Sequence, residues 1–318
     1  MSGEAPHCLV LSDGRRGIEN QALGLAESCA ALRPLKLRQH HVSHSKMVAA
    51  LPPRAQLRLG KFDLPKCDIA IGCGRQAIAP LLYLKSCRPE VMTVYVQDPR
   101  MEGSAFDLII APEHDALQGD NVESMIGSPN RVTKDKIILE TLNFATGLSK
   151  LAMPRTAMLI GGTSKTHNLD KDTHQSHLEI ARTLRTAGQS LLISTSRRTP
   201  DFAVADWRRF SSDNDHVWLH DGDGPNPYFA FLGGAEMILV TEDSTNMLTE
   251  ACATGKPVYR LPMSGKPGKF LTLYGALERR CGVSAYAGQL SGDDYAPLNE
   301  TARVAQRVWE RYDARKTA

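Results

Sequence analysis

Between Val240 and Val258 the chain reads VTEDSTNMLTEACATGKPV. The apolar run 237–240 at its start predicts a buried strand. A helix is expected from about residue 246 to residue 254. Gly255 is typical of a left-handed helix stop, and Pro257 prevents the helix from continuing. The stretch therefore predicts a strand, a polar turn and a helix, which is the repeating unit of an α/β fold.

Hydroxyl side chains at the start of this helix indicate an anion site. Ser244 or Thr245 stands at the N-cap, where unpaired backbone N–H groups and the helix dipole favour negative charge. Glu250 lies about one and a half turns further on, within reach of a sugar hydroxyl beside a bound phosphate. An ordinary capped junction between a strand and a helix explains the same residues, so both interpretations stay open here.

Length and composition limit the class of protein. The 318 residues exceed one typical core and predict two domains. No apolar run approaches the roughly 20 residues of a membrane span, and the polar start 1–6 is unlike a secretory signal. Seven scattered cysteines without a C-x-x-C pair favour a reducing, cytoplasmic location over disulfides or a zinc site. A net charge of +3 is too small to indicate nucleic-acid binding.

The alternation of strands and helices restarts near residue 150 and indicates parallel βαβ units. We predict an N-terminal Rossmann-like domain over 1–150 and a C-terminal Rossmann-like domain over 151–300. A last helix over 301–318 carries an arginine at every fourth position from 303 to 315. Like charges so placed repel, so a partner surface, either the first domain or a membrane, is expected to cover them. Predicted strands lie at 7–11, 67–71, 91–96, 106–111, 156–160, 190–194, 217–220, 237–240 and 258–262.

Glycines and polar residues follow the first predicted strand. The fingerprint G-x-G-x-x-G is absent, which disfavours a nicotinamide cofactor. Open α/β sheets bind ligands at the carboxyl ends of their strands, so we predict an acceptor site here. A solvated turn is the alternative. The predicted acceptor-binding residues are Gly14, Gly17, Asn20, Gln21 and, after a later strand, Arg75.

Two residues at strand ends are candidate general bases. Asp13 follows the first predicted strand, and His114 follows the strand at 106–111. Either could deprotonate an acceptor hydroxyl, and the pKa of histidine is naturally near neutrality. A lone histidine at such a place is more often structural.

Glycines, hydroxyls and basic residues recur at the strand ends of the second predicted domain. Gly161-Gly162 can contact phosphate through backbone N–H groups, although the spacing of a P-loop is missing. Arginines and lysines are suited to a diphosphate, and a basic surface turn is the alternative. The predicted donor-binding residues are Gly161, Gly162, Ser196, Arg197, Arg198, Asn226, Ser244, Thr245, Asn246, Glu250, Lys266 and Lys269.

The segment from Ser28 to Phe62 contains no acidic residue. Its cationic residues are interleaved with apolar ones, a pattern that suits anionic lipid headgroups or a phosphorylated acceptor. A solvated basic face explains the pattern equally.

Two Rossmann-like halves, each with a glycine turn after its first strand, resemble the GT-B glycosyltransferase architecture, in which two domains face a cleft. There the first domain usually takes the acceptor and the second takes the nucleotide-sugar donor. The stretch 240–258 is similar to the donor-domain signature of lipid-linked sugar transferases. The resemblance implies that residues 244–246 contact phosphate or sugar and that Glu250 contacts ribose or sugar hydroxyls.

A closer resemblance extends over nearly the whole chain. Its motifs include Cys73-Gly74-Arg75, Gln97-Asp98-Pro99, Asn226-Pro227-Tyr228 and Gly255-Lys256-Pro257. They are similar to the mitochondrial-fission "elongated mitochondria" family, which occurs in plants and bacteria and is itself similar to GT-B proteins. Its plant members imply a role in recruiting fission machinery to the outer mitochondrial surface. The short chain favours the bacterial type.

Three functions remain open. The first is a metal-independent glycosyltransferase that moves a sugar from a nucleoside diphosphate to an envelope or lipid acceptor, with basic side chains neutralising the leaving diphosphate. No cofactor or metal is expected, because Asp221-Gly222-Asp223 fits a metal-binding D-x-D motif in its letters alone. The second is a nucleotide-sugar epimerase, which needs several carboxylates or histidines around the sugar. The third is a non-catalytic adaptor that binds a membrane, peripherally, or a partner. The sequence carries no signal for an oligomeric state.

Overall fold

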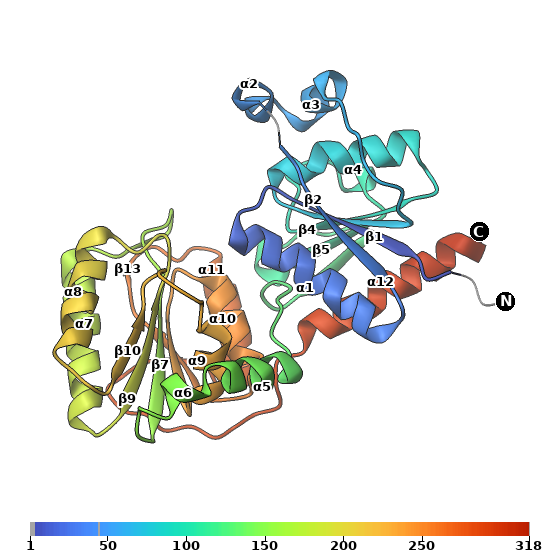
Figure 1. Cartoon of the computed structure of the whole chain (residues 1–318). Coiled ribbons are helices and arrows are strands. Elements are labelled where there is room, and N and C mark those ends of the chain that lie inside the picture. Colours follow the sequence, from blue (N-terminus) through green and yellow to red (C-terminus); the bar gives the residue numbers. More distant parts are fainter. Residues whose placement is uncertain (1–3, 44, 318) are drawn as a thin grey trace. The chain divides into compact units, whose positions relative to one another are not determined.

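A computed structural model describes residues 4–43 and 45–317. The chain forms two compact units: the first runs to Arg131 and includes the segment from Asn299 onward, and the second is Val132–Leu298. Each unit is a parallel β-sheet flanked by helices (Figure 1). The predicted α/β fold with two Rossmann-like halves is confirmed.

The first unit is built on a sheet of order β2-β1-β3-β4-β5-β6, in which neighbouring strands are parallel. Buried apolar residues of β1, β3, β4 and β5 form its core. Its elements are β1 (His7–Ser12), α1 (Arg16–Leu32), β2 (Lys36–His41), α2 (Lys46–Ala50), α3 (Pro53–Leu59), β3 (Ile69–Cys73), α4 (Arg75–Cys87), β4 (Met92–Val96), β5 (Leu108–Pro112), β6 (Val122–Met125) and α12 (Glu300–Thr317).

Strand β2 lies in the basic segment, where the sequence predicts a surface and no strand. β2 pairs with β1 along its whole length. It is an edge strand whose side chains are largely exposed, so it lacks the apolar run that marks the buried strands. The spacing of apolar residues in the sequence therefore could not reveal β2.

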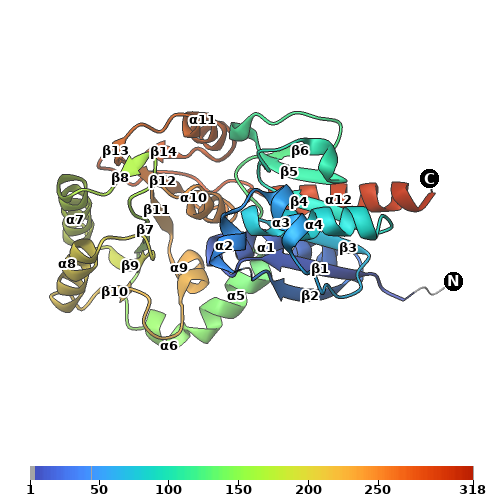
Figure 2. The same cartoon turned by 90° about the horizontal axis from the view of Figure 1, so that it is seen from above.

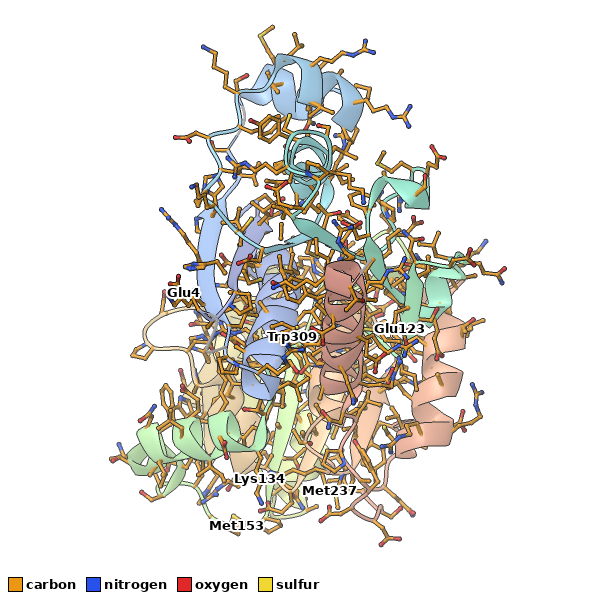
Figure 3. All side chains as sticks on the ribbon, turned by 90° about the vertical axis from the view of Figure 1, so that its right-hand side faces the viewer. Glu4, Glu123, Lys134, Met153, Met237 and Trp309 are labelled. Atoms are coloured by element: carbon orange, nitrogen blue, oxygen red, sulfur yellow. The ribbon has the colours of Figure 1, made fainter. Side chains whose placement is uncertain are left out.

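Helix α12 packs on the first unit, which is one of the two partner surfaces expected for it. Its buried side chains Val304, Val308 and Trp309 join the core beneath α1. The Trp309 indole donates a hydrogen bond to the Cys29 carbonyl at 3.0 Å. In Figure 3, Trp309 on α12 lies beside α1.

The arginine stripe of α12 is covered by the first unit rather than by a membrane. Arg303 and Arg307 pair with Glu123 of β6, and Arg315 pairs with Asp107 just before β5. Figure 3 shows Glu123 next to α12. These ion pairs offset the repulsion between the arginines.

The second unit has a sheet of order β10-β9-β7-β11-β12-β14. Helices α7 and α8 cover one face of this sheet, and α9 and α10 cover the other (Figures 1 and 2). Its elements are α5 (Lys134–Asn143), α6 (Ala145–Leu148), β7 (Arg155–Ile160), β8 (His167–Asn168), α7 (Lys171–Thr186), β9 (Ser190–Thr195), α8 (Asp201–Ser212), β10 (Val217–His220), α9 (Tyr228–Gly234), β11 (Met237–Thr241), α10 (Thr245–Cys252), β12 (Val258–Leu261), β13 (Ser264–Gly265), α11 (Phe270–Cys281) and β14 (Ser284–Ala285).

The units divide at Arg131 and not at residue 150, because α5 packs on α9. The approach is so close that a Cβ on Gly233 would lie 2.2 Å from the Thr141 hydroxyl. Helices α5 and α6 therefore belong to the second unit. The stretch Met153-Pro154-Arg155, which resembles a linker in sequence, lies inside that unit at the start of β7.

Candidate functional site

The loops after β7 and β11 lie at one point on the carboxyl edge of the second sheet. These two strands pair, whereas the chain leaves β7 toward β9 and leaves β11 toward β12. The loops therefore diverge at a topological switch point, where open α/β sheets bind ligands. Gly161-Gly162 and Asp243-Ser244 occupy this point.

A buried carboxylate, Asp243, organises the switch point. It accepts hydrogen bonds from the Gly162 amide at 3.0 Å and from the Thr241 hydroxyl at 2.7 Å. A Cβ on Gly161 would lie 2.1 Å from an Asp243 oxygen, and one on Gly162 would lie 1.9 Å from the Arg198 carbonyl. Both glycines are therefore required by packing. Both amides predicted to hold phosphate are bonded within the protein: that of Gly162 to Asp243, and that of Gly161 to the Thr241 hydroxyl at 2.7 Å.

Arg198 is held at this edge by the same carboxylate. Its guanidinium lies 2.6 Å from Asp243, whose side chain is fully buried, while 45% of the Arg198 side chain is exposed. A guanidinium oriented in this way keeps an exposed surface for a phosphate. Its neighbour Arg197 is exposed as well.

Ser196 shapes the turn that carries these arginines. Its hydroxyl accepts a hydrogen bond from the Arg198 amide at 3.1 Å. The Thr199 hydroxyl donates to the Gly161 carbonyl at 2.5 Å, which fastens the loop after β9 to the glycine turn after β7. Thr199 is absent from the predicted set, because threonine beside a proline carries no signal of such a contact.

A cavity of about 320 Å³ adjoins this turn. Its lining includes Ser196, Arg197 and Thr199 from the loop after β9, and Arg208 and Asp221 from α8 and the end of β10. Ligand cavities begin at about this volume. The candidate site therefore continues from the switch point along the carboxyl edge of the sheet into this cavity.

Helix α10 begins where the sequence predicts. The Ser244 hydroxyl caps it by accepting a bond from the Met247 amide at 3.4 Å. Thr245 and Asn246 form its first turn and are half-buried. Gly255 has the expected positive φ of 78°.

Glu250 is buried in α10 and accepts a hydrogen bond from the Tyr228 hydroxyl at 2.6 Å. Burial raises the pKa of Glu250 to about 7. The Asn226 side chain accepts from the Tyr228 amide at 3.0 Å and so fixes the start of α9. Asn226 and Glu250 thus converge on Tyr228, a residue that is missing from the predicted site. Contact of either residue with a sugar stays a prediction.

The basic loop of Lys266 and Lys269 is tied to the glycine turn. Strand β13 pairs antiparallel with β8 in the loop after β7, and the Lys266 amide bonds to the Thr166 carbonyl at 2.8 Å. Gly265 is needed there, with φ of 135° and a virtual Cβ 2.2 Å from the same carbonyl. Both lysines are exposed. This pairing holds the loop of Lys266 and Lys269 against the loop that follows β7.

In the first unit the matching switch point lies between β1 and β3. Gly14 has the positive φ that its turn requires, and Gly17 and Asn20 lie in the first turns of α1. Asp13 is bound by Arg15, with 2.7 Å between carboxylate and guanidinium. Gln21 is buried and accepts from the Gln97 side chain at 3.0 Å. The predicted acceptor residues around β1 therefore gather at one edge.

Arg75 contacts the end of α2, and the acceptor contact stays a prediction. Its guanidinium donates to the carbonyls of Ala49, Ala50 and Leu51 at the end of α2, at 3.4, 3.2 and 2.8 Å. These bonds satisfy carbonyls that a helix end leaves without partners. Arg75 is a structural residue in this arrangement.

The two candidate bases are separated. Asp13 follows β1 and His114 follows β5, with β3 and β4 between them. At about 4.8 Å per strand the strand ends lie about 14 Å apart. His114 is buried in a short turn, with its ring 3.9 Å from Asp115. The two residues therefore cannot act on the same proton.

Two sequence motifs are structural. Lys256 is half-buried, and its ammonium donates to the carbonyls of Leu232, Gly233 and Ala235 at the end of α9. Asp221 of the D-x-D motif pairs with Arg208 at 2.5 Å. In the part of the chain that the structure describes, no cluster of three or more His, Cys, Asp or Glu residues suits a metal ion. No helix over the same residues has the length and apolarity to cross a bilayer.

Solved structures share this fold. UDP-GlcNAc 2-epimerase from Methanocaldococcus jannaschii is 11% identical and has a TM-score of 0.56, covering 96% of this chain and 99% of its own. Its complex with UDP-GlcNAc and UDP has a TM-score of 0.52 at 12% identity, with the same coverage. At this identity the likeness shows the fold alone, which is of the GT-B type.

Two curated proteins show sequence similarity. The mitochondrial fission protein ELM1 of Arabidopsis thaliana is 28% identical over 275 residues, which are 78% of this chain and 64% of the plant protein. The chain thus matches less than two thirds of that relative. An uncharacterised protein of Rickettsia prowazekii (strain Madrid E) is 24% identical, covering 94% of this chain and 96% of its own. The family model for mitochondrial fission ELM1 matches residues 16–312, nearly the whole sequence. The chain therefore belongs to the mitochondrial fission ELM1 family.

Proposed function

We propose that the second unit binds a nucleoside diphosphate sugar at the carboxyl edge of β7 and β11. The observation that carries this proposal is the Arg198–Asp243 pair, in which a buried carboxylate aims a half-exposed guanidinium over a glycine turn. Arg197, Lys266 and Lys269 add exposed positive charge on the adjoining loops. The M. jannaschii epimerase, with the same fold, binds UDP-GlcNAc and UDP, which supports a nucleotide-sugar ligand here.

The reaction that we propose is transfer of the sugar to an envelope or lipid-linked acceptor without a metal ion. Negative charge develops on the diphosphate as the glycosidic bond breaks. Fixed guanidinium and ammonium groups stabilise that charge without reorganising. Asp13 is the proposed base, because it lies with Gly14, Asn20 and Gln21 at the switch point of the first unit.

Calorimetric titration tests donor binding. UDP, GDP and UDP-GlcNAc are titrated into the wild type, Arg198→Gln and Arg209→Gln. Arg209 is an exposed arginine in the last turn of α8 and serves as the matched control. We expect Arg198→Gln to weaken diphosphate binding by about tenfold to a hundredfold, as for a lost charged hydrogen bond. Equal weakening by Arg209→Gln, or no binding by the wild type, would contradict the proposal.

Release of UDP distinguishes the reactions. We expect release from UDP-GlcNAc, or from another bound donor, only when membrane extract supplies an acceptor, and we expect no effect of EDTA. Conversion of the donor's sugar into its epimer in the absence of membrane extract would favour the epimerase.

A second candidate is a ligand-binding adaptor without catalysis. It is favoured by the engagement of the proposed base Asp13 with Arg15. The plant relative carries the name of a fission protein. Nucleotide binding with no turnover of any donor, with or without membrane extract, would support it.

A further inference from the structure

The segment from Ser45 to Lys61, which contains α2 and α3, forms a basic corner of the first unit; we call it the α2–α3 corner. Its sequence contains no aspartate or glutamate. Arg54 and Arg58 are one helical turn apart on α3, and both are exposed, as is Lys61. The corner therefore presents cations on one short projection.

The same corner exposes large apolar side chains. Met47 on α2 is 84% exposed, and Leu59 at the end of α3 is 66% exposed. Single exposed apolar residues are common, but here they accompany cations on two consecutive helices that contact each other. Methionine and leucine are stabilised when they leave water for an apolar environment.

The corner is held in place by hydrogen bonds. The fully buried Gln56 side chain donates to the carbonyls of Ala49 and Leu51 at 3.2 and 2.9 Å. Arg75 and Gln76 from α4 donate to carbonyls of the same helix end. A surface fixed in this way loses little conformational entropy when it binds.

We propose that the α2–α3 corner docks the protein on a bilayer that contains anionic lipid. Lipid phosphates attract the guanidinium and ammonium groups, and the apolar side chains enter the boundary between headgroups and acyl chains. A bilayer with anionic lipid offers both kinds of contact at one surface, phosphates for the cations and an apolar layer for Met47. The pair of Arg54 with Glu102, 3.6 Å apart and highly exposed on both sides, is weak and leaves Arg54 available. The proposal does not depend on nucleotide binding.

Flotation of the full-length protein with vesicles tests this surface. The vesicles are phosphatidylcholine alone, or phosphatidylcholine with 30% phosphatidylglycerol, at low and at physiological salt. We expect binding to the anionic vesicles that weakens as salt rises. The double variant Arg54→Gln/Arg58→Gln should weaken it roughly thirtyfold, from the usual contribution of each basic residue near such a surface. Met47→Gln should weaken it about tenfold through lost insertion.

The matched control is Leu142→Gln on α5, which removes a side chain that is 67% exposed in the second unit. It should leave vesicle binding unchanged, and all variants should keep the wild-type melting temperature because the sites are exposed. Equal binding to both kinds of vesicle, or equal loss with Leu142→Gln, would overturn the proposal. Loss with the arginine variant but none with Met47→Gln would show attraction by charge alone and would overturn docking by insertion.

Discussion

At the scale of single residues, Asp243 connects the parts of the candidate site. It binds Gly162, Thr241 and Arg198, which come from three separate loops or strand ends. Gly162 and Asp243 are 81 positions apart in the chain. The aspartate stands in the sequence beside the predicted N-cap, yet nothing in its neighbours reveals that it is buried.

Asp243→Asn should lower both stability and ligand binding. The substitution keeps the size of the side chain but removes the charge that holds Arg198. We expect the free energy of unfolding to fall by about 1–3 kcal/mol, and nucleotide affinity to fall with it. Urea unfolding and calorimetry measure the two effects. Asp223→Asn, at a carboxylate that is 92% exposed, is the control and should change neither. A wild-type affinity for Asp243→Asn would argue against orientation of Arg198 by this carboxylate.

Glu250 should make stability depend on pH. Burial raises its pKa to about 7 in the folded protein, so between about pH 4.5 and 7 the folded state holds a proton that the unfolded state has lost. Stability is therefore expected to fall as pH rises through that window. The variant Glu250→Gln cannot ionise at this position, so its stability should not show this decrease with rising pH.

The difference between wild type and Glu250→Gln should change by up to about 3 kcal/mol between pH 4.5 and 8, in favour of the variant at high pH. Urea unfolding at several pH values measures it. A difference that stays constant across the range would show that Glu250 does not titrate there.

At the scale of elements, the turn after β7 requires glycine for packing and not for backbone angle. A Cβ on Gly162 would meet the backbone of Arg198 and Thr199, which cannot move like a flexible side chain. Gly275 in α11 is different, because its nearest contact is the end of the Arg279 side chain at 3.3 Å.

Gly162→Ala should destabilise the protein by at least about 2 kcal/mol, as overpacking does. Gly275→Ala should stabilise it by about 0.4–1 kcal/mol, because alanine suits a helix interior better. Denaturant unfolding compares the two variants. If both variants lost stability equally, the two glycines would not differ in packing as described here.

At the scale of the whole molecule, the chain leaves the first unit at Arg131 and returns to it at Asn299. Helix α12 therefore completes the core of a unit that begins some 300 residues earlier in the chain. The arginine stripe of this helix predicted a partner surface, either the first domain or a membrane, and the observed ion pairs are with the first unit.

Trp309→Ala should destabilise the first unit by about 3–5 kcal/mol, because it empties a core site and removes the bond to Cys29. Hydrogen exchange read by mass spectrometry should show lost protection in peptides of α1 and β1. Peptides of β7, β9 and β11 should keep theirs. Equal loss of protection in both units would mean that they unfold as one.

The sequence alone determined the α/β class, the buried strands, the start of α10 and the family. These features depend on local periodicity, capping and motifs, which are visible within a few positions. Tertiary structure decided what each polar side chain contacts. Arg75 closes α2, Lys256 closes α9 and Asp243 holds Arg198 because distant segments come together. It also decided that α5 joins the second unit and that β2 is an edge strand. In the stretch 240–258, the sequence located the turn and the helix, and the fold around them made it a candidate site.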